Sequence, residues 1–352
     1  MIKLLIVDDS ALMRRQLSAL FEAEGGFQVR LARNGREAVE ENRVYQPDVV
    51  TLDINMPEMD GLTALSLMMQ ERPVPVVMIS SLTEKGALAT FEALNLGAVD
   101  YVVKPGGTIS LSIDQISAAV LSKVRVAAAA RLKPPRAARG SGAAAVRPAP
   151  AAPAFQRRPV GRDGIVVIGV STGGPRTLEL ILPLLPADLP CPVLVAQHMP
   201  ASFTLSFAQR LDLICPMRVV EANRPMALEA GVIYIGKGGS DMQVVRRAGK
   251  ATVIAKPEQA QFLWHPSVEL LGRSVLEQYE AGQVLGVMLT GMGNDGADAF
   301  TEIRKRGGRT IAESEESSVV FGMPAELISR GGACVTLHAD QIALQINAWM
   351  GR

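Results

Sequence analysis

Short runs of aliphatic and β-branched residues alternate with longer amphipathic stretches through the first 130 residues of the chain. The apolar runs predict strands at 2–7, 27–31, 48–52, 75–79 and 98–103. The amphipathic stretches predict helices near 11–23, 35–43, 61–70, 84–95 and 112–130. Strand–helix units in succession are typical of a parallel sheet covered by helices on both faces. We therefore expect residues 1–130 to form one α/β domain.

The alternation resumes at Gly164 and continues to the end of the chain. Strands are expected here at 165–170, 193–197, 217–220, 232–235, 243–246, 252–254 and 284–289. A Gly-rich turn and a helix follow the first of them. Further helices are expected near 203–212, 266–278, 297–306 and 341–350. Residues 163–352 are thus predicted to form a second, doubly wound and mainly parallel α/β domain.

The segment between the two domains has a different composition. Residues 131–162 consist largely of Ala, Pro, Gly and basic residues, and they contain no acidic residue. Because proline interrupts helices and few large apolar side chains are present, we expect an extended or disordered linker. Binding of an acidic partner by the basic residues is the alternative interpretation.

The overall composition favours a two-domain cytoplasmic protein. The 352 residues are 48% hydrophobic, which is sufficient for two cores, and the formal net charge of +1 does not indicate binding to nucleic acid or an anionic membrane. The N-terminal apolar run is too short for a signal peptide, and no run of about 18 apolar residues predicts membrane insertion. The three cysteines are too few and too widely spaced for a disulfide framework or a zinc site.

Polar residues gather where the predicted strands of the first domain end: Asp8, Asp9, Asp53, Ser80 and Lys104. The carboxyl ends of parallel strands meet at one edge of a sheet, so these side chains are expected to lie together. Three neighbouring carboxylates repel one another unless a lysine or a hard divalent cation such as Mg²⁺ neutralises them. One of these carboxylates can then attack a phosphoryl group and form an acyl phosphate, and Asp53 is the best candidate for this role. Ser80 and Lys104 would bind the oxygens of the new phosphoryl group.

Three segments carry a specific resemblance: Ile-Val-Asp-Asp-Ser (6–10), Leu-Asp-Ile-Asn-Met-Pro-Glu-Met-Asp-Gly (52–61) and Gly-Ala-Val-Asp-Tyr-Val-Val-Lys-Pro (97–105). Residues 1–125 resemble a two-component response-regulator receiver domain, which implies a flavodoxin-like (βα)5 fold. The resemblance implies phosphorylation of Asp53 by a histidine kinase. It also implies Mg²⁺ bound by Asp9, Asp53 and the carbonyl of Asn55, with Asp8 nearby. Ser80 and Tyr101 match the residues that shift on phosphorylation in this family.

In the second domain, Ser171, His198 and Asp295 each follow a predicted strand. Ser171 lies in Gly169-Val-Ser-Thr-Gly-Gly, a strand-to-helix turn that would present its hydroxyl beside free N–H groups suited to an oxyanion. His198 follows the strand at 193–197, and Asp295 follows Leu-Thr-Gly-Met-Gly-Asn. The three side chains can therefore converge as nucleophile, base and orienting carboxylate. An α/β-hydrolase order, Ser171, Asp295 and His338, remains an alternative from these residues alone.

Four motifs distinguish these possibilities: Val-Ser-Thr-Gly-Gly-Pro (170–175), Gln-His-Met-Pro (197–200), Leu-Thr-Gly-Met-Gly-Asn-Asp-Gly-Ala (289–297) and Ser-Ser-Val-Val-Phe-Gly-Met-Pro (317–324). Residues 163–350 resemble the catalytic domain of the chemotaxis protein-glutamate methylesterases, the CheB family. The resemblance implies that Ser171 attacks, His198 is the base and Asp295 orients it, and we expect Thr172 and Met292 to supply the oxyanion N–H groups. It implies hydrolysis of glutamyl methyl esters on chemoreceptors, often with deamidation of receptor glutamines, and a chemotaxis histidine kinase as phosphodonor.

The chain departs from the family pattern at one segment. Tyr-Ile-Gly-Lys-Gly-Gly-Ser-Asp (234–241) stands where relatives commonly have Tyr-Ile-Ala-Pro-Gly and a downstream histidine. Lys237 replaces the proline and Asp241 replaces the histidine. We expect this segment near the rim of the active site, where it would affect the choice of substrate or receptor.

Two other functional classes fit the sequence less well. A receiver joined to a non-catalytic binding module is disfavoured because Ser171, His198 and Asp295 are all present. A DNA-binding response regulator is disfavoured because residues 163–352 contain no candidate recognition helix with clustered basic residues. In the favoured interpretation, the unphosphorylated receiver covers the esterase site and phosphorylation of Asp53 moves it away.

Overall fold

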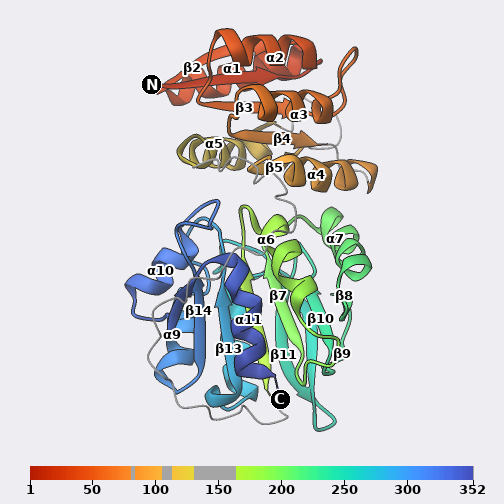
Figure 1. Cartoon of the computed structure of the whole chain (residues 1–352), viewed down its shortest axis with the longest axis vertical. Coiled ribbons are helices and arrows are strands. Elements are labelled where there is room, and N and C mark those ends of the chain that lie inside the picture. Colours follow the sequence, from red (N-terminus) through yellow and green to blue (C-terminus); the bar gives the residue numbers. More distant parts are fainter. Residues whose placement is uncertain (81–83, 105–112, 131–163, 352) are drawn as a thin grey trace, which may run out of the picture.

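The computed structural model describes residues 1–80, 84–104, 113–130 and 164–351, and it shows two α/β domains stacked one on the other (Figure 1). The predicted linker at 131–162 lies outside the described residues. None of the described helices combines the length and the apolar character needed to cross a bilayer.

The first domain has a single parallel sheet of five strands in the order β2-β1-β3-β4-β5. Its strands are β1 (Ile2–Val7), β2 (Phe27–Ala32), β3 (Val49–Asp53), β4 (Val76–Ser80) and β5 (Asp100–Val103). Its helices are α1 (Ala11–Glu24), α2 (Gly35–Val44), α3 (Gly61–Glu71), α4 (Glu84–Leu96) and α5 (Ile113–Ala129). The predicted flavodoxin-like (βα)5 fold is confirmed, with bounds close to those expected from the hydrophobic pattern.

Local sequence determines where several of these helices begin. Ser10, Asn34 and Asp60 precede α1, α2 and α3, and each side chain accepts a hydrogen bond from the backbone N–H three residues further on. At the start of α3, a Cβ on Gly61 would lie 2.0 Å from the carbonyl oxygen of Asp53. Only glycine allows α3 to start this close to the end of β3.

The second domain is built on a seven-stranded parallel sheet in the order β15-β14-β13-β6-β7-β10-β8. The strands are β6 (Ile165–Val170), β7 (Val193–Gln197), β8 (Arg218–Ala222), β10 (Val232–Gly236), β13 (Val284–Met288), β14 (Arg309–Glu313) and β15 (Val335–Leu337). The helices are α6 (Gly174–Ile181), α7 (Ala201–Ile214), α8 (Val268–Gln278), α9 (Ala297–Lys305), α10 (Met323–Ser329) and α11 (Ala339–Met350), with short 3-10 turns at Leu182–Leu184 and Ala281–Gln283. Every residue of β6, β7 and β13 is buried, as expected for strands covered on both faces.

The predicted doubly wound α/β fold is confirmed, with two differences in detail. The expected strands at 243–246 and 252–254 form an antiparallel hairpin, β11 (Asp241–Arg247) and β12 (Lys250–Lys256), in a separate sheet with β9 (Met226–Ala227). Strands β14 and β15 and helix α10 were not predicted, because they are short and carry polar residues within their apolar runs. Neither difference changes the central strands β13, β6 and β7.

The strand order places β6 beside both β7 and β13, so the chain crosses to opposite sides of β6. In open α/β sheets such a position leaves a crevice beyond the carboxyl ends of the strands. The residues that follow β6, β7 and β13 therefore meet at one place.

Candidate active site and phospho-acceptor site

Ser171 directly follows β6, in a turn that only small residues permit. Its backbone N–H donates to the carbonyl of Thr290, 2.9 Å away, which joins it to the loop after β13. Gly173 has a positive φ of 80°, and a Cβ on Gly174 would lie 2.0 Å from Gln197 Oε1. The two glycines thus let the chain turn from β6 into α6 with Ser171 partly exposed at the bend.

His198 directly follows β7, and its ring is held by Asp295. His198 Nε2 lies 2.8 Å from Asp295 Oδ2. The backbone N–H of His198 donates to the carbonyl of Val170, and Gln197 Nε2 donates to the carbonyls of Ser171 and His198, both at 3.0 Å. Gln197 thus ties the serine turn to the histidine turn. His198 Nδ1 is buried and has no hydrogen-bond partner among the described residues, which leaves this nitrogen available to accept a proton.

Asp295 lies against the N-terminus of α8. Its carboxylate accepts hydrogen bonds from the backbone N–H groups of Val268 (2.7 Å) and Glu269 (3.0 Å) and from Ser267 Oγ (3.0 Å). Burial alone would raise the pKa of Asp295, but the hydrogen bond and charge of His198, with those two backbone N–H groups, lower it below its ordinary value. Asp295 is therefore an ionised carboxylate, suited to stabilise a positive charge on His198.

Two backbone N–H groups near Ser171 have no acceptor among the described residues. Within the described parts of the chain, no hydrogen bond engages the N–H of Thr172 or of Met292. A Cβ on Gly291 would lie 2.7 Å from the Cβ of Ser171, so the loop carrying Met292 packs directly against the serine. The two residues expected to bind an oxyanion, one next to Ser171 and one on the loop packed against it, therefore have backbone N–H groups free for that role.

The alternative base, His338, does not approach this site. It begins α11 after the edge strand β15, which β14 and β13 separate from β6. Its Nδ1 lies 2.8 Å from Asp340, and its side chain is 41% exposed. The structure brings Asp295 to His198 and leaves His338 at the surface.

Sequence reasoning missed three residues at the site: Gln197, Trp264 and Ser267. Trp264 stacks on His198, with ring centroids 5.7 Å apart and 5° between the planes. Ser267 is the N-cap of α8 and bonds Asp295. The N-cap was detectable, because a serine precedes the apolar pattern of the helix, whereas the contact of Trp264 with His198 depends on folding of a distant loop.

Asp241 and Lys237 lie in different environments. Lys237 is exposed, whereas Asp241 is completely buried at the start of β11, so Asp241 itself offers no surface to a substrate. Asp241 accepts hydrogen bonds from the backbone N–H groups of Gln259 and Ser267, both at 3.1 Å, and lies 2.8 Å from His265 Nδ1. A buried acceptor with three partners holds a loop in place and does not contact a large substrate.

The second site lies at the carboxyl edge of the receiver sheet. Asp8 and Asp53 are buried and Asp9 is exposed, and carboxylate oxygens of the three lie within 4.8 Å of one another. Lys104 Nζ lies 2.9 Å from Asp8 and 2.8 Å from Asp53. Burial raises the pKa of Asp53 to about 6 even though Lys104 opposes the shift, and Asp8 adds to it. Burial would lower the pKa of Lys104, but the two carboxylates raise it above its ordinary value.

This donor set suits a hard divalent cation. Carboxylate oxygens that converge within bonding range of one point, with one exposed side, are what Mg²⁺ prefers. Asn55 is exposed just after β3, where its carbonyl can join them. Ser80 ends β4 opposite Val103 in the sheet, and its side chain lies outside the described residues.

The receiver lies directly over the esterase site, through α4, β5 and α5 (Figure 1). Thr172 Oγ1 donates to Asp100 Oδ2 at 2.6 Å, and Lys123 donates to the other oxygen of Asp100 at 2.8 Å. Ser122 Oγ lies 3.5 Å from the sulfur of Met292. Both expected oxyanion residues thus contact the receiver.

Aromatic side chains form the rest of this contact. Tyr101 stacks on Phe203 of α7 with centroids 4.9 Å apart, and Phe91 of α4 packs against Phe203 and Phe207. The hydroxyl of Tyr101 is buried without a hydrogen-bond partner among the described residues. The residue expected to move on phosphorylation is therefore part of the surface that meets the catalytic domain.

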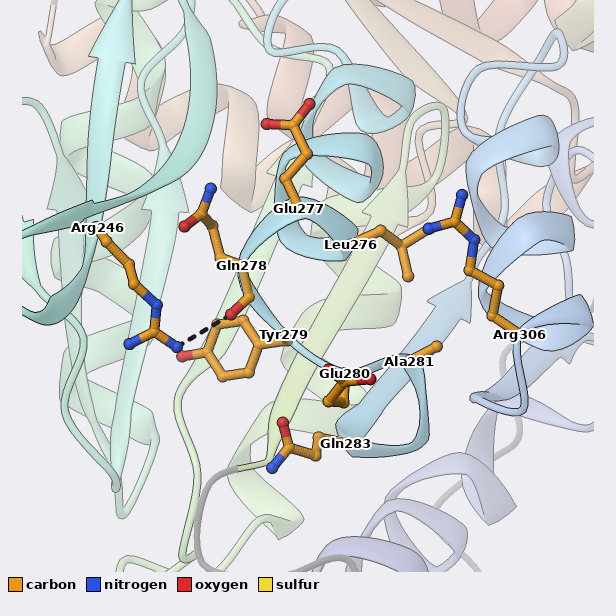
Figure 2. Close-up of a pocket in the computed structure, with 9 residues that line it drawn as sticks. All are labelled: Arg246, Leu276, Glu277, Gln278, Tyr279, Glu280, Ala281, Gln283 and Arg306. Atoms are coloured by element: carbon orange, nitrogen blue, oxygen red, sulfur yellow. Dashed lines mark hydrogen bonds between the residues drawn. The ribbon is translucent and has the colours of Figure 1, made fainter.

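A polar cavity lies at the opposite edge of the catalytic sheet. Figure 2 shows it between Arg246, the end of α8 and Arg306, next to Gln283, where the chain enters β13. Arg246 donates to the carbonyl of Gln278 at 3.1 Å. This cavity is at the amino end of β13, so it is remote from Ser171, His198 and Asp295.

The fold and the two sites define a response regulator whose output domain is a hydrolase. Residues 4–113 match the family described as response regulator receiver domain, and residues 166–346 match the family described as CheB methylesterase. The chain belongs to the CheB methylesterase family.

Full-length relatives agree with this assignment. The protein-glutamate methylesterase/protein-glutamine glutaminase 3 of Rhodospirillum rubrum is 54% identical over 360 residues, covering 100% of this chain and 97% of that protein. The corresponding protein of Caldanaerobacter subterraneus is 48% identical, covering 97% and 95%. The crystal structure of the Thermotoga maritima CheB methylesterase catalytic domain, 38% identical, has a TM-score of 0.51 and covers 52% of this chain and 97% of that chain.

Proposed function

We propose that this chain is a phosphorylation-regulated protein-glutamate methylesterase, and also a glutamine deamidase, that acts on chemoreceptors. The observation that carries the proposal is the pairing of His198 with Asp295 beside Ser171, with Nδ1 of His198 free of other partners. The named activities of full-length relatives support the substrate class.

In the proposed reaction, Nε2–H of His198 donates a hydrogen bond to Asp295, so Nδ1 carries the free lone pair. Nδ1 takes the proton of Ser171 as its Oγ attacks the glutamyl ester carbonyl. The N–H groups of Thr172 and Met292 bind the oxyanion, and the ionised Asp295 stabilises the imidazolium. The imidazolium protonates the leaving methoxide oxygen, which departs as methanol, or the leaving amide nitrogen of a glutamine, which departs as ammonia. His198 then activates a water molecule that releases the receptor glutamate and regenerates Ser171.

The receiver supplies control. Asp53 attacks the phosphoryl group of a chemotaxis histidine kinase, as its position beside Asp8, Asp9 and Lys104 supports. Receiver domains of response regulators generally need Mg²⁺ for phosphorylation. Asp8, Asp9, Asp53 and the carbonyl of Asn55 would hold the ion here, and it would neutralise the negative charge of the carboxylates and the phosphoryl group. Lys104 and Ser80 then bind the phosphoryl oxygens.

Phosphorylation would loosen the receiver from the catalytic domain. It adds a charge of about −2 beside Lys104, and the phosphoryl oxygens become new hydrogen-bond acceptors for the ammonium group of Lys104. Movement of Tyr101 toward Ser80 would break its stack on Phe203, and displacement of β5 would release Thr172 from Asp100. Residues 131–162 act in this proposal as a tether, and the protein is placed in the cytoplasm, without contact to nucleic acid or insertion into a membrane.

Methanol release from methylated receptor membranes tests this function. Ser171→Ala and His198→Ala should each lower the rate by several orders of magnitude, because the serine and its base act as one unit. His338→Ala is the matched control and should keep wild-type activity, since His338 is exposed and bonded to Asp340. Substantial activity in a folded Ser171→Ala protein would exclude the mechanism, and loss of activity in His338→Ala alone would favour the α/β-hydrolase order.

A further inference from the structure

The indole of Trp264 stacks on the imidazole of His198 in a nearly parallel, offset arrangement. The ring centroids are 5.7 Å apart, and the planes differ by 5°. We propose that Trp264 is a positioning residue for the base His198, and that buried Asp241 holds the loop that presents it. This inference rests on the proposed esterase function and adds to it a specific requirement of this chain.

The loop that carries Trp264 is held by Asp241 on both sides of the tryptophan. Before it, the N–H of Gln259 donates to Oδ2 of Asp241 at 3.1 Å. After it, the N–H of Ser267 and the ring of His265 both bond Oδ1, at 3.1 and 2.8 Å. Asp241 has no exposed surface, so these partners replace the water that an ionised carboxylate would otherwise bind.

The other side of the indole is defined by the loop that carries Asp295. A Cβ on Gly293 would lie 2.8 Å from a ring carbon of Trp264, so the loop approaches the ring as closely as glycine allows. Gly293 also has a positive φ of 87°. Trp264 is thereby fixed between His198 and the loop after β13, and it is only half-buried itself.

The geometry gives the stack a role that Asp295 does not fill. Asp295 contacts one edge of the imidazole, at Nε2, and an edge contact leaves the ring free to tilt about that bond. A face contact fixes the plane, which decides whether the lone pair on Nδ1 points at Ser171. The indole face also attracts the imidazolium that forms during the reaction.

Asp241 acts on both partners of His198 at once. Through Ser267 it holds the residue whose hydroxyl bonds Asp295, and through the loop it holds Trp264. Replacement of Asp241 should therefore affect every ester, because the defect lies in the base and not in a receptor contact. This differs from the effect on receptor choice expected from the sequence.

Tryptophan fluorescence tests the contact without any assay of activity. The chain has two tryptophans, so Trp349→Phe leaves Trp264 as the only one. A ring stacked on the indole covers one of its faces, so loss of that ring changes the surroundings of the indole. In the full-length Trp349→Phe protein, His198→Ala should therefore change the emission intensity and wavelength of Trp264 at constant pH, and Asp340→Asn should leave them unchanged. Emission that His198→Ala does not change would overturn the proposal.

Kinetics test the consequence, with methylated receptor membranes and a small ester as the two substrates. Trp264→Ala should lower kcat about 10- to 100-fold with little change in KM, the usual scale for a misplaced catalytic group. Trp264→Phe should recover a large part of the loss, because it restores an aromatic face. Asp241→Asn should lower kcat on both substrates, since an amide cannot accept all three hydrogen bonds.

Matched controls separate a positioning role from general damage. Asp340→Asn removes another aspartate that bonds a histidine at 2.8 Å, but at an exposed place remote from the site, and Trp349→Phe removes the other tryptophan. Both should keep wild-type kcat. Wild-type protein that is inactive on both substrates overturns the proposed function and this inference together. Active wild-type protein with an equally active Trp264→Ala variant, or a loss in Asp241→Asn on receptors alone, overturns the inference only.

Discussion

At the scale of single residues, burial changes the chemistry of Asp53, the proposed phospho-acceptor. Asp53 is 3% exposed, and its pKa rises from an ordinary 3.8 to about 6, chiefly because burial disfavours the charged form. Lys104 restrains this shift by its contact at 2.8 Å. The carboxylate that must attack phosphorus is therefore maintained in its charged form by a neighbouring cation, against the effect of its surroundings.

Asp53→Asn should stabilise the receiver at neutral pH. The folded carboxyl keeps its proton up to about pH 6 whereas the unfolded one loses it near pH 3.8. The stability from this group is thus complete below pH 3.8 and is lost as the pH rises through about 6. Two pH units correspond to a maximum of about 3 kcal/mol. In metal-free buffer, the free energy of unfolding of Asp53→Asn should exceed that of the wild-type protein most above pH 7, and the difference should shrink toward pH 5. A pH-independent difference would contradict the shifted pKa.

At the scale of elements, the N-terminus of α8 acts as the holder of Asp295. The positive end of a helix dipole and two free N–H groups stabilise a carboxylate placed there, and Val268 and Glu269 supply those groups. The N-cap Ser267 accepts the N–H of Leu270 and donates to Asp295. A single helix start thus links fold stability to the orientation of the base.

Ser267→Ala should therefore lower both stability and activity. Loss of an N-cap costs about 1 kcal/mol, and loss of a hydrogen bond to the charged Asp295 should lower kcat about tenfold. Asn34→Ala removes the N-cap of α2, where Asn34 accepts the N–H of Glu37 at 2.9 Å, and is the matched control. Both variants should melt at a lower temperature, but only Ser267→Ala should lose esterase activity. Equal activities would show that Asp295 does not need this donor.

At the scale of the whole molecule, the two domains share a continuous apolar contact. Phe91 and Tyr101 of the receiver meet Phe203 and Phe207 of α7, a helix that starts just after His198. The polar link from Asp100 to Thr172 reaches the residue next to the nucleophile. In the proposed regulation, opening of this contact and access to Ser171 are one event.

Phe91→Ala should raise basal methanol release without a phosphodonor. Aromatic pairs contribute about 0.5–1.5 kcal/mol beyond their buried area, so loss of two shifts the closed form toward the open one by about tenfold. The control is Phe27→Ala, which removes an aromatic pair with Phe21 of α1. Phe27 lies on β2, the strand at the far edge of the receiver sheet from β5. It should lower the melting temperature without raising the basal rate.

Removal of residues 1–150 gives a second measure of the same contact. The shortened protein should hydrolyse receptor esters faster than the unphosphorylated full-length protein, and Asp53→Ala or Lys104→Ala should stop phosphodonors from activating the latter. If the shortened protein is no faster, occlusion is wrong, and the receiver would act by recruitment to receptors.

The sequence by itself determined most of the fold and many of the candidate residues. Parallel sheets buried on both faces require uninterrupted apolar strands, so β1, β6 and β7 were visible as runs of aliphatic residues, and the polar residues that follow them were visible as sites. Strands β14 and β15 were not visible, because polar residues interrupt their short apolar runs.

Only the tertiary structure decided which of these groups touch. The pairing of Asp295 with His198 and not with His338, the burial of Asp241, and the stack of Trp264 on His198 all join residues from separate loops. Periodicity reports which face of an element is buried, but it carries no information on which distant loop covers it. The contact of Asp100 with Thr172 is the hardest to predict from sequence, because it depends on how the two domains pack against each other.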